Sequence, residues 1–376
     1  MSVDDDLPEA DRVEGAPHPR ETVTLYGHAQ AEADFLDAFN SDRLHHGWLI
    51  SGAEGVGKAT LAWRIARFLL ATPMDDGDSL FGAPPAPTSL DISPDHPVAH
   101  RVAALSDPGL FLMRRAYDHK KKGLKTVITV DEVRKMKSFF GLSATDGGRR
   151  VAIIDSADEM NPSAANAVLK LLEEPPANTT LLLISHQPSR LLPTIRSRCR
   201  ALRLGTLAPQ DMADALHQAG VELDDHQALA ALSGGSVGAA VRLANLGGEA
   251  LYRDLIALFH DLPQLDRPKA LALAQSVVGK AAADRFDLML NLLDLFMTRL
   301  ARSGAGALPD PQAAQGEAEL MARLCPDAHS ARIWAQTAQE LGARVRRGHA
   351  VNLDPAALIL DTVLRIDQTA ASLAAR

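Results

Sequence analysis

Residues 52–60 read GAEGVGKAT, and this stretch decides the fold. It fits the pattern of a phosphate-binding loop (P-loop), whose glycines let successive backbone N–H groups surround phosphates while Lys58 reaches their outer oxygens. In the pattern the next residue is a Ser or Thr that holds Mg²⁺, but here it is Ala59. Thr60 comes one residue late, and one residue turns a side chain by roughly 100° around a helix. The motif predicts a nucleotide-type fold whose metal site lacks its hydroxyl ligand.

An apolar strand that ends in an acid should supply the second half of such a site. Residues 151–155 read VAIID, and Asp155 would stand at the carboxyl end of that strand, where P-loop enzymes hold Mg²⁺. Hydrolytic members follow with a glutamate that activates water, but here Ser156 follows, and a hydroxyl is far too weak a base to replace it. The alternative is that Asp155 merely ends a strand. The candidate nucleotide-site residues are Gly52, Gly55, Gly57, Lys58, Thr60 and Asp155, and weak nucleotide binding and no binding both remain open.

Two further segments carry a resemblance to a known family. Residues 166–176 read NAVLKLLEEPP, and residues 192–199 read LPTIRSRC. Together they resemble the AAA+ core of bacterial clamp-loader subunits, and weaker similarity extends from residues 25–28 to residues 352–355. The resemblance implies an α/β P-loop core, a parallel sheet flanked by helices, followed by a small helical lid and an all-α collar.

The resemblance assigns Arg198, in the Ser-Arg-Cys element, as an arginine finger that reaches the γ-phosphate in a neighbouring subunit's site. A planar guanidinium that is always charged suits this role, because it can stabilise charge developing on a transferred phosphoryl group. The alternative is a surface arginine in a salt bridge, since five arginines crowd residues 190–203.

A third departure concerns residues 235–238, which read GSVG. ATP-hydrolysing relatives carry Gly-Ser-x-Arg here, and Gly238 cannot replace that nucleotide-sensing arginine. Arg242, one helical turn further, is a possible substitute. The losses at Ala59, Ser156 and Gly238 together predict that the chain has no ATPase activity of its own.

The resemblance therefore implies a non-hydrolysing subunit of the DNA polymerase III clamp loader, a heteropentameric ring that loads the sliding clamp onto primed DNA. Its partners would be motor subunits of gamma/tau type and a delta subunit, within an assembly that is a DNA-directed DNA polymerase. We expect no required cofactor, weak or absent binding of ATP and Mg²⁺, and no zinc. The alternatives are an active gamma/tau-like ATPase and a free-standing P-loop nucleotide switch.

Composition and chain breakers give the expected organisation. The boundaries are a disordered tail at 1–22, the P-loop core at 23–205 with a loop-rich insertion at 71–110, the lid at 206–247 and the collar at 248–376. The insertion has no cysteine, so we expect that a zinc module found in many relatives has been lost.

Charge and cysteine content restrict the function further. The 376 residues carry a net charge of −8, which argues against a protein that wraps DNA by itself. The only cysteines are Cys199 and Cys325, which rules out a disulfide framework. Residues 1–20 are polar, and no run of ~18 apolar residues occurs, so a cytoplasmic protein is expected.

Overall fold

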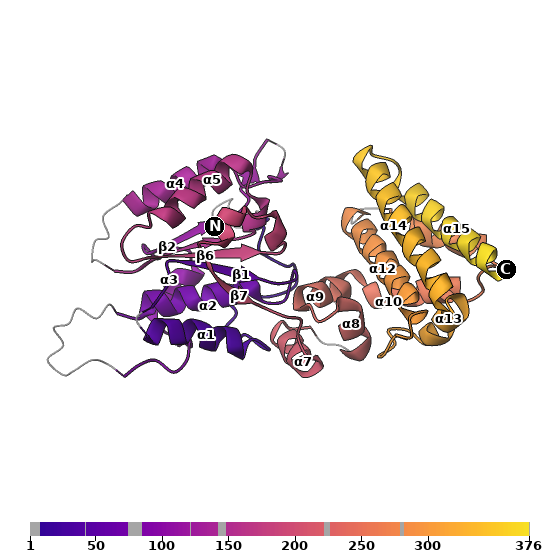
Figure 1. Cartoon of the computed structure of the whole chain (residues 1–376), viewed down its shortest axis with the longest axis horizontal. Helices are drawn as coiled ribbons and strands as arrows, with labels where there is room; N and C mark the ends of the chain where they lie inside the picture. Colours follow the sequence, from indigo (N-terminus) through magenta and orange to yellow (C-terminus); the bar gives the residue numbers. More distant parts are fainter. Residues whose placement is uncertain are drawn as a thin grey trace. The chain divides into compact units, whose positions relative to one another are not determined.

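The computed structural model describes residues 8–41, 43–73, 85–120, 122–141, 148–221, 226–278 and 282–375. The chain divides into two compact units (Figure 1). The first comprises residues 1–220 together with 236–238, and the second comprises residues 221–235 and 239–376. The residues expected to form the lid, 206–247, are divided between the two units.

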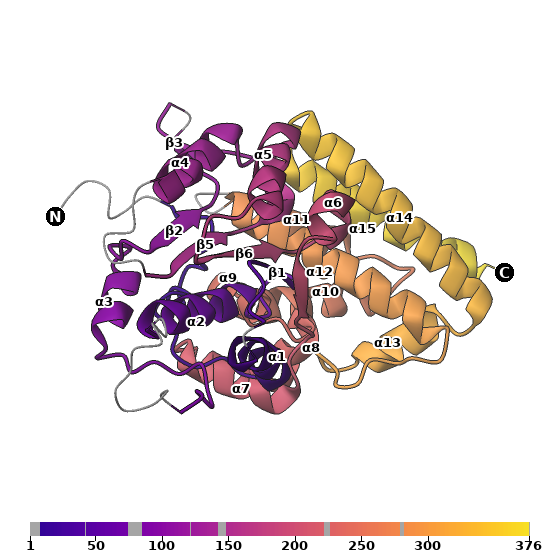
Figure 2. The same cartoon turned by 60° about the vertical axis from the view of Figure 1, so that its left-hand side comes forward.

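A five-stranded parallel sheet is the centre of the first unit. Its strand order is β2-β5-β6-β1-β7, which Figure 2 shows from β2 to β1. The strands are β1 (Gly47–Ser51), β2 (Leu110–Met113), β5 (Arg150–Ile154), β6 (Thr179–Ser185) and β7 (Arg200–Arg203). Strands β1 and β6 are buried along their whole length, as expected of a parallel sheet covered on both faces. This explains why their sequences are apolar runs without alternation.

Helices cover both faces of this sheet (Figure 1): α1 and α2 lie on one face, and α4 and α5 lie on the other. These helices are α1 (Ala29–Asn40), α2 (Lys58–Ala71), α4 (Val130–Gly141) and α5 (Pro162–Glu173). The shorter elements are α3 (Pro97–Ala103), η1 (Ala157–Glu159), η2 (Pro188–Arg190), α6 (Pro193–Arg196), α7 (Pro209–Gln218) and an antiparallel pair, β3 (Tyr117–Asp118) with β4 (Gly123–Leu124). The predicted α/β class with a parallel sheet is confirmed.

Helix α5 begins at an asparagine followed by a proline, a pair that is typical of a helix start. The Asn161 side chain accepts a hydrogen bond from the Ala164 N–H at 2.8 Å, and Pro162 occupies the first turn. An N-cap side chain satisfies one of the donors that a helix start leaves free, and proline is tolerated there. The helix ends at Glu173, before the prolines at 175 and 176, which cannot continue a helix.

Two expectations for loops and tails differ from the structure. Of the expected tail 1–22, residues 1–7 lie outside the described residues, but residues 8–22 are held against the first unit. His18 is buried, and Arg67 on α2 donates to the carbonyl oxygens of Arg20 at 2.7 Å and Thr22 at 2.8 Å. In the expected insertion 71–110, residues 74–84 are not described, while α3 lies within the rest. Tertiary contacts order segments whose composition alone predicts none.

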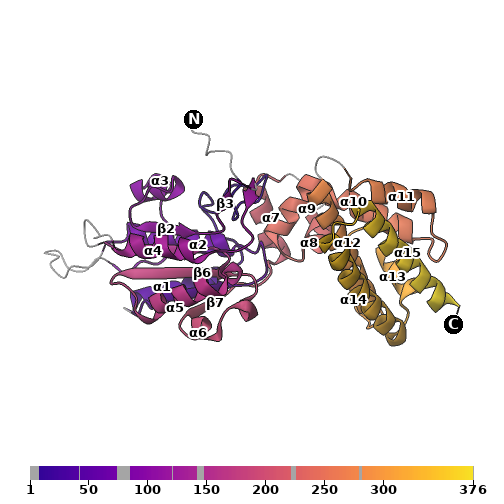
Figure 3. The same cartoon turned by 90° about the horizontal axis from the view of Figure 1, so that it is seen from above.

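The second unit is helical. Its elements are α8 (His226–Ser233), α9 (Val237–Leu246, whose first two residues belong to the first unit), α10 (Gly248–Phe259), α11 (Arg267–Gln275), α12 (Ala282–Ser303), α13 (Glu317–Leu324), α14 (Ala328–Ala350) and α15 (Pro355–Ala374). Helices α12, α14 and α15 lie side by side (Figure 3). Phe286, Leu293 and Leu300, which recur on α12 at a spacing of seven residues, are buried.

A buried polar cluster ties α13 to the rest of the second unit. Glu317 is fully buried and accepts a hydrogen bond from the Tyr252 hydroxyl at 2.5 Å. Its carboxylate also lies 3.2 Å from Arg299 Nη1 and accepts from the Ala313 N–H at 2.7 Å. Buried carboxylates are tolerated only when paired in this way. Glu317 therefore fixes the loop that precedes α13.

No single helix among the described residues is long and apolar enough to cross a membrane. By length and composition, residues 227–233 and Val237–Leu246 pass that test only as a pair, which is bent by 115°.

Candidate functional site

The P-loop connects β1 to α2 in the conformation that its glycines permit. Gly55 has a φ of 75° and Gly57 a φ of 103°, which are backbone conformations that residues with a Cβ rarely adopt. Lys58 is buried, and its ammonium donates to the carbonyl of Gly52 at 2.9 Å and to that of Ala53. Burial lowers the pKa of Lys58 to about 8, against the opposing effect of nearby acids. The lysine therefore binds carbonyls of its own loop.

Asp155 follows β5, as predicted. Burial, reinforced by the charge of Asp11, raises the pKa of Asp155 to about 7. No ion pair joins its carboxyl to the Lys58 ammonium within the described part of the chain. A carboxyl with this pKa is largely protonated just below neutral pH, and a protonated carboxyl is a poor ligand for Mg²⁺.

The position of the water-activating glutamate is filled by a serine in a left-handed conformation. Ser156 has a φ of 58°, and its Oγ lies 3.1 Å from His186 Nε2 at the end of β6. Asp158 accepts bonds from the backbone N–H groups of His186 and Gln187, at 3.0 and 3.2 Å. Glu159 is paired with Arg115 at 2.7 Å. The nearby carboxylates thus already have protein partners, and the serine–histidine contact joins the ends of two strands.

Metal ligation has little support at this site. The Ala59 side chain has no oxygen, and Thr60 follows it on α2 in a half-buried position. Across the ranges that the structure describes, no group of three His, Cys, Asp or Glu side chains could hold a metal ion. Of the candidate nucleotide-site residues, the structure brings Gly52, Gly55, Gly57, Lys58 and Asp155 together around one loop.

Residues 236–238 contact the P-loop, which the sequence did not indicate. Ser236 Oγ donates to the Glu54 carbonyl at 2.8 Å, and the Gly238 N–H donates to the Gly55 carbonyl at 3.0 Å. All of these residues belong to the first unit. The sequence motif indicated only that position 238 lacks an arginine. The contact between Gly238 and the P-loop is visible only in the folded chain.

The N-terminal segment 8–22 is a second contributor that the sequence did not reveal. Arg114, just after β2, pairs with Glu9 at 2.7 Å and also with Asp11, whose side chain is almost fully buried. Asp11 is close enough to act on the charge of Asp155. Acidic residues in a polar terminal stretch resemble a solvated tail, so composition could not have identified this role.

Arg198 lies at the end of α6, on a different part of the first unit. Its Nη2 lies 3.0 Å from Glu173 Oε1, and its Nη1 donates to the Thr194 carbonyl at 3.2 Å. Its side chain is 38% exposed, so the guanidinium can still reach a second molecule. Within this chain Arg198 therefore forms a surface salt bridge, which is the alternative to the arginine finger.

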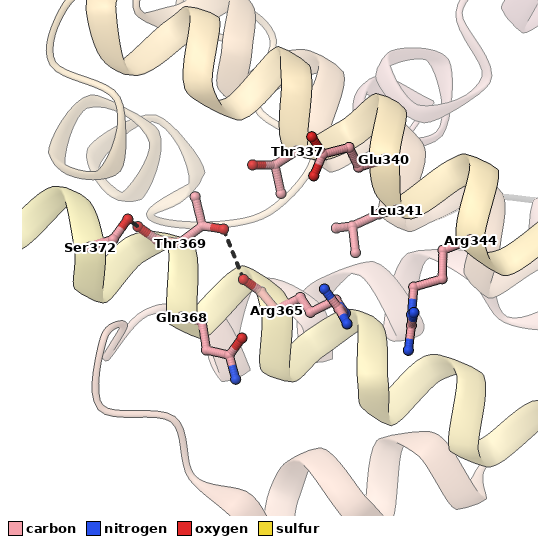
Figure 4. A pocket seen from close by; sticks show the side chains of 8 residues that line it. All are labelled: Thr337, Glu340, Leu341, Arg344, Arg365, Gln368, Thr369 and Ser372. Atoms are coloured by element: carbon pink, nitrogen blue, oxygen red, sulfur yellow. Dashed lines mark hydrogen bonds between the residues drawn. The ribbon is translucent and has the colours of Figure 1, made fainter.

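A groove lies between α14 and α15 in the second unit (Figure 4). It is lined by Thr337, Glu340, Leu341, Arg344, Arg365, Gln368, Thr369 and Ser372. Both arginines bind Asp361, at 2.5 and 3.3 Å. Since one carboxylate already offsets part of their charge, the groove gives no clear indication of a ligand.

Comparison with known proteins agrees with the resemblance noted in the sequence. The family described as "DNA polymerase III, delta subunit" matches residues 27–208. The chain is 37% identical over 214 residues to DNA polymerase III subunit delta' of Pseudomonas aeruginosa, covering 54% of this chain and 56% of that protein. It therefore spans little more than half the length of that relative.

A longer match and a solved structure extend the comparison. The Escherichia coli DNA polymerase III subunit delta' is 29% identical over 335 residues, covering 88% of this chain and 91% of that protein. Among solved structures, a DNA polymerase III gamma subunit-related protein of Thermotoga maritima is similar, with a TM-score of 0.39 and 17% identity over 90% of this chain and 100% of that chain.

Proposed function

We propose that this chain, which is similar to bacterial DNA polymerase III subunits delta', is a clamp-loader subunit of that type and does not itself hydrolyse ATP. The observation that carries the proposal is the state of Lys58, whose ammonium is bound to carbonyls of its own loop. The raised pKa of Asp155 and the lack of a side-chain oxygen at Ala59 support the same conclusion, because both weaken the ligands that would hold Mg²⁺. The subunit would act as a fixed member of the ring.

The second part of the proposal is that Arg198 acts on a neighbouring motor subunit of gamma/tau type. Arg198 contacts Glu173 and Thr194, and among the described residues no hydrogen bond or ion pair joins its side chain to the P-loop. In a chain without a working site of its own, a partly exposed guanidinium is available to a site on another subunit. Such arginines contribute about 10³ to 10⁵ in rate in well-studied phosphoryl-transfer systems.

The test is a reconstituted ring that contains Arg198→Ala. We expect assembly to be unchanged and ATP hydrolysis stimulated by clamp and primed DNA to fall, because one of the active sites loses its trans-acting donor. Arg198→Lys should fall nearly as far, since an ammonium cannot reproduce the guanidinium fork. Arg196→Ala, two residues away and also exposed, is the matched control. Wild-type hydrolysis and clamp loading by the Arg198→Ala ring would show that this arginine is structural.

The second candidate function is an active gamma/tau-like ATPase, which the P-loop lysine still allows. Isolated protein should release phosphate only at the background rate, whatever the Mg²⁺ concentration. Sustained release that Lys58→Ala abolishes would favour the ATPase. A free-standing nucleotide switch would be favoured if the chain failed to co-purify with the motor subunit.

A further inference from the structure

Residues 236–238, here called the glycine clip, close on the outer turn of the P-loop through two hydrogen bonds. Ser236 Oγ donates to Glu54 O at 2.8 Å, and Gly238 N donates to Gly55 O at 3.0 Å. Ser236 is itself buried. Two consecutive carbonyls of the loop are therefore satisfied by one short segment that lies about 180 residues later in the chain.

The contact depends on the absence of side chains at two facing glycines. A Cβ added to Gly238 would lie 2.9 Å from Gly55 Cα. A Cβ added to Gly55 would lie 2.4 Å from Ser236 Oγ and 2.9 Å from Gly238 Cα. Real Cβ atoms essentially never approach backbone this closely, so either substitution must separate the two segments.

We infer that the glycine clip holds the P-loop in a fixed conformation without a nucleotide. In a P-loop that binds nucleotide, the phosphates supply partners that order the loop. Here the clip supplies partners for two of the loop's carbonyls, and the Lys58 ammonium supplies them for two others, at Gly52 and Ala53. The conformation of the loop is then fixed by contacts within the chain itself, without a ligand.

This inference goes beyond the proposed function. There Gly238 matters only because it replaces a nucleotide-sensing arginine, whereas here the glycine itself has a structural role. Any residue with a Cβ at 238 would disturb the clip, so an arginine there and a closed clip exclude each other. Gly238 is then required for a rigid, ligand-independent loop, which is a property separate from catalysis.

Amide hydrogen exchange of the full-length chain, without nucleotide or partner subunits, tests the inference. In Gly238→Ala we expect exchange of peptides covering residues 52–58 to accelerate at least tenfold, since local opening becomes easier. Gly205→Ala is the matched control, because a Cβ at Gly205 meets nothing within 4 Å. Peptides covering β6 should exchange as in the wild type, which confirms that the fold is kept.

Ser236→Ala provides a second variant should Gly238→Ala fail to fold. It removes one hydrogen bond without adding volume, and exchange in residues 52–58 should rise about three- to tenfold. Ser189→Ala, at an exposed serine, is its control. Exchange within twofold of wild type in the folded clip variants would overturn the clip. That result would leave the Arg198 test in the ring unaffected, so the two proposals can fail separately.

Discussion

Arg198 is paired with Glu173 of the same chain, with Nη2 and Oε1 separated by 3.0 Å. The two side chains are 38% and 44% exposed, so water screens their attraction, and such surface pairs contribute little to stability. Releasing the guanidinium to a phosphate on another molecule would therefore cost little. The salt bridge and the role proposed in the ring are compatible.

The first prediction is that this pair contributes less than about 0.5 kcal/mol to the free energy of unfolding. Arg198→Ala, Glu173→Gln and the double variant should unfold in denaturant with nearly the same midpoint. A double-mutant cycle measures the coupling energy directly. A coupling above about 1 kcal/mol would mean that Arg198 is held too firmly in its own chain to be given up easily.

The second prediction concerns the buried carboxyl of Asp155, whose pKa is raised from 3.8 to about 7. Between these values the folded chain keeps a proton that the unfolded chain has lost, so this group's contribution to stability falls as pH rises from about 4 to 7. Asp155→Asn cannot ionise and should melt roughly 2 °C or more above wild type at pH 8, with the difference closing near pH 4.

Melting curves of Asp155→Asn across this pH range check the sign. Asp95→Asn, at an exposed carboxylate, controls for the change in net charge. If Asp155→Asn melted below wild type at pH 8, the carboxylate would be stabilising and a bound cation or ion pair would have to be reconsidered.

The third prediction concerns Glu317 in the second unit. Glu317→Ala leaves Arg299, the Tyr252 hydroxyl and the Ala313 N–H without their shared partner, and the expected loss is about 3 kcal/mol. Chemical denaturation should show this loss, while Glu319→Ala, exposed on the same helix, should change stability by less than about 0.5 kcal/mol. Equal effects of the two substitutions would contradict the importance of the cluster.

The fourth prediction is that chelators leave the melting temperature unchanged, since a structural metal would contribute to folding directly. The chain has no cysteine between Lys58 and Asp155, and no metal-binding group occurs within the described residues. Melting untagged protein with and without EDTA, alongside a metal analysis, is the measurement. Stoichiometric zinc would show that the expectation for residues 71–110 was wrong.

The sequence predicted those elements whose signals are local. The P-loop at 52–60 and the strand that ends at Asp155 were recognised from a motif and an apolar run, and the Asn161 cap of α5 is a signal of the same local kind. Strand β2 was missed because Leu110–Met113 borders a segment rich in loop-forming residues, and its pairing with β5 is a long-range contact.

The missed parts of the site depend on contacts between distant residues. Nothing near Ser236 in the sequence indicates that its hydroxyl meets the Glu54 carbonyl, and nothing near Asp11 indicates that its charge raises the pKa of Asp155. For Arg198 the sequence suggested a surface salt bridge but could not identify Glu173 as the partner. Periodicity and motifs carry no information about such pairs.

The contacts of Arg67 have a consequence for how the N-terminal segment can vary. Arg67 is buried on α2, where burial lowers its pKa to about 10, and its guanidinium binds the main-chain oxygens of Arg20 and Thr22. Because every residue type has a carbonyl group, these two hydrogen bonds do not require particular amino acids at positions 20 and 22. They require only the arginine at position 67. The path of the segment at residues 20 and 22 therefore depends on Arg67, whereas at residues 9 and 11 it depends on the side chains that pair with Arg114.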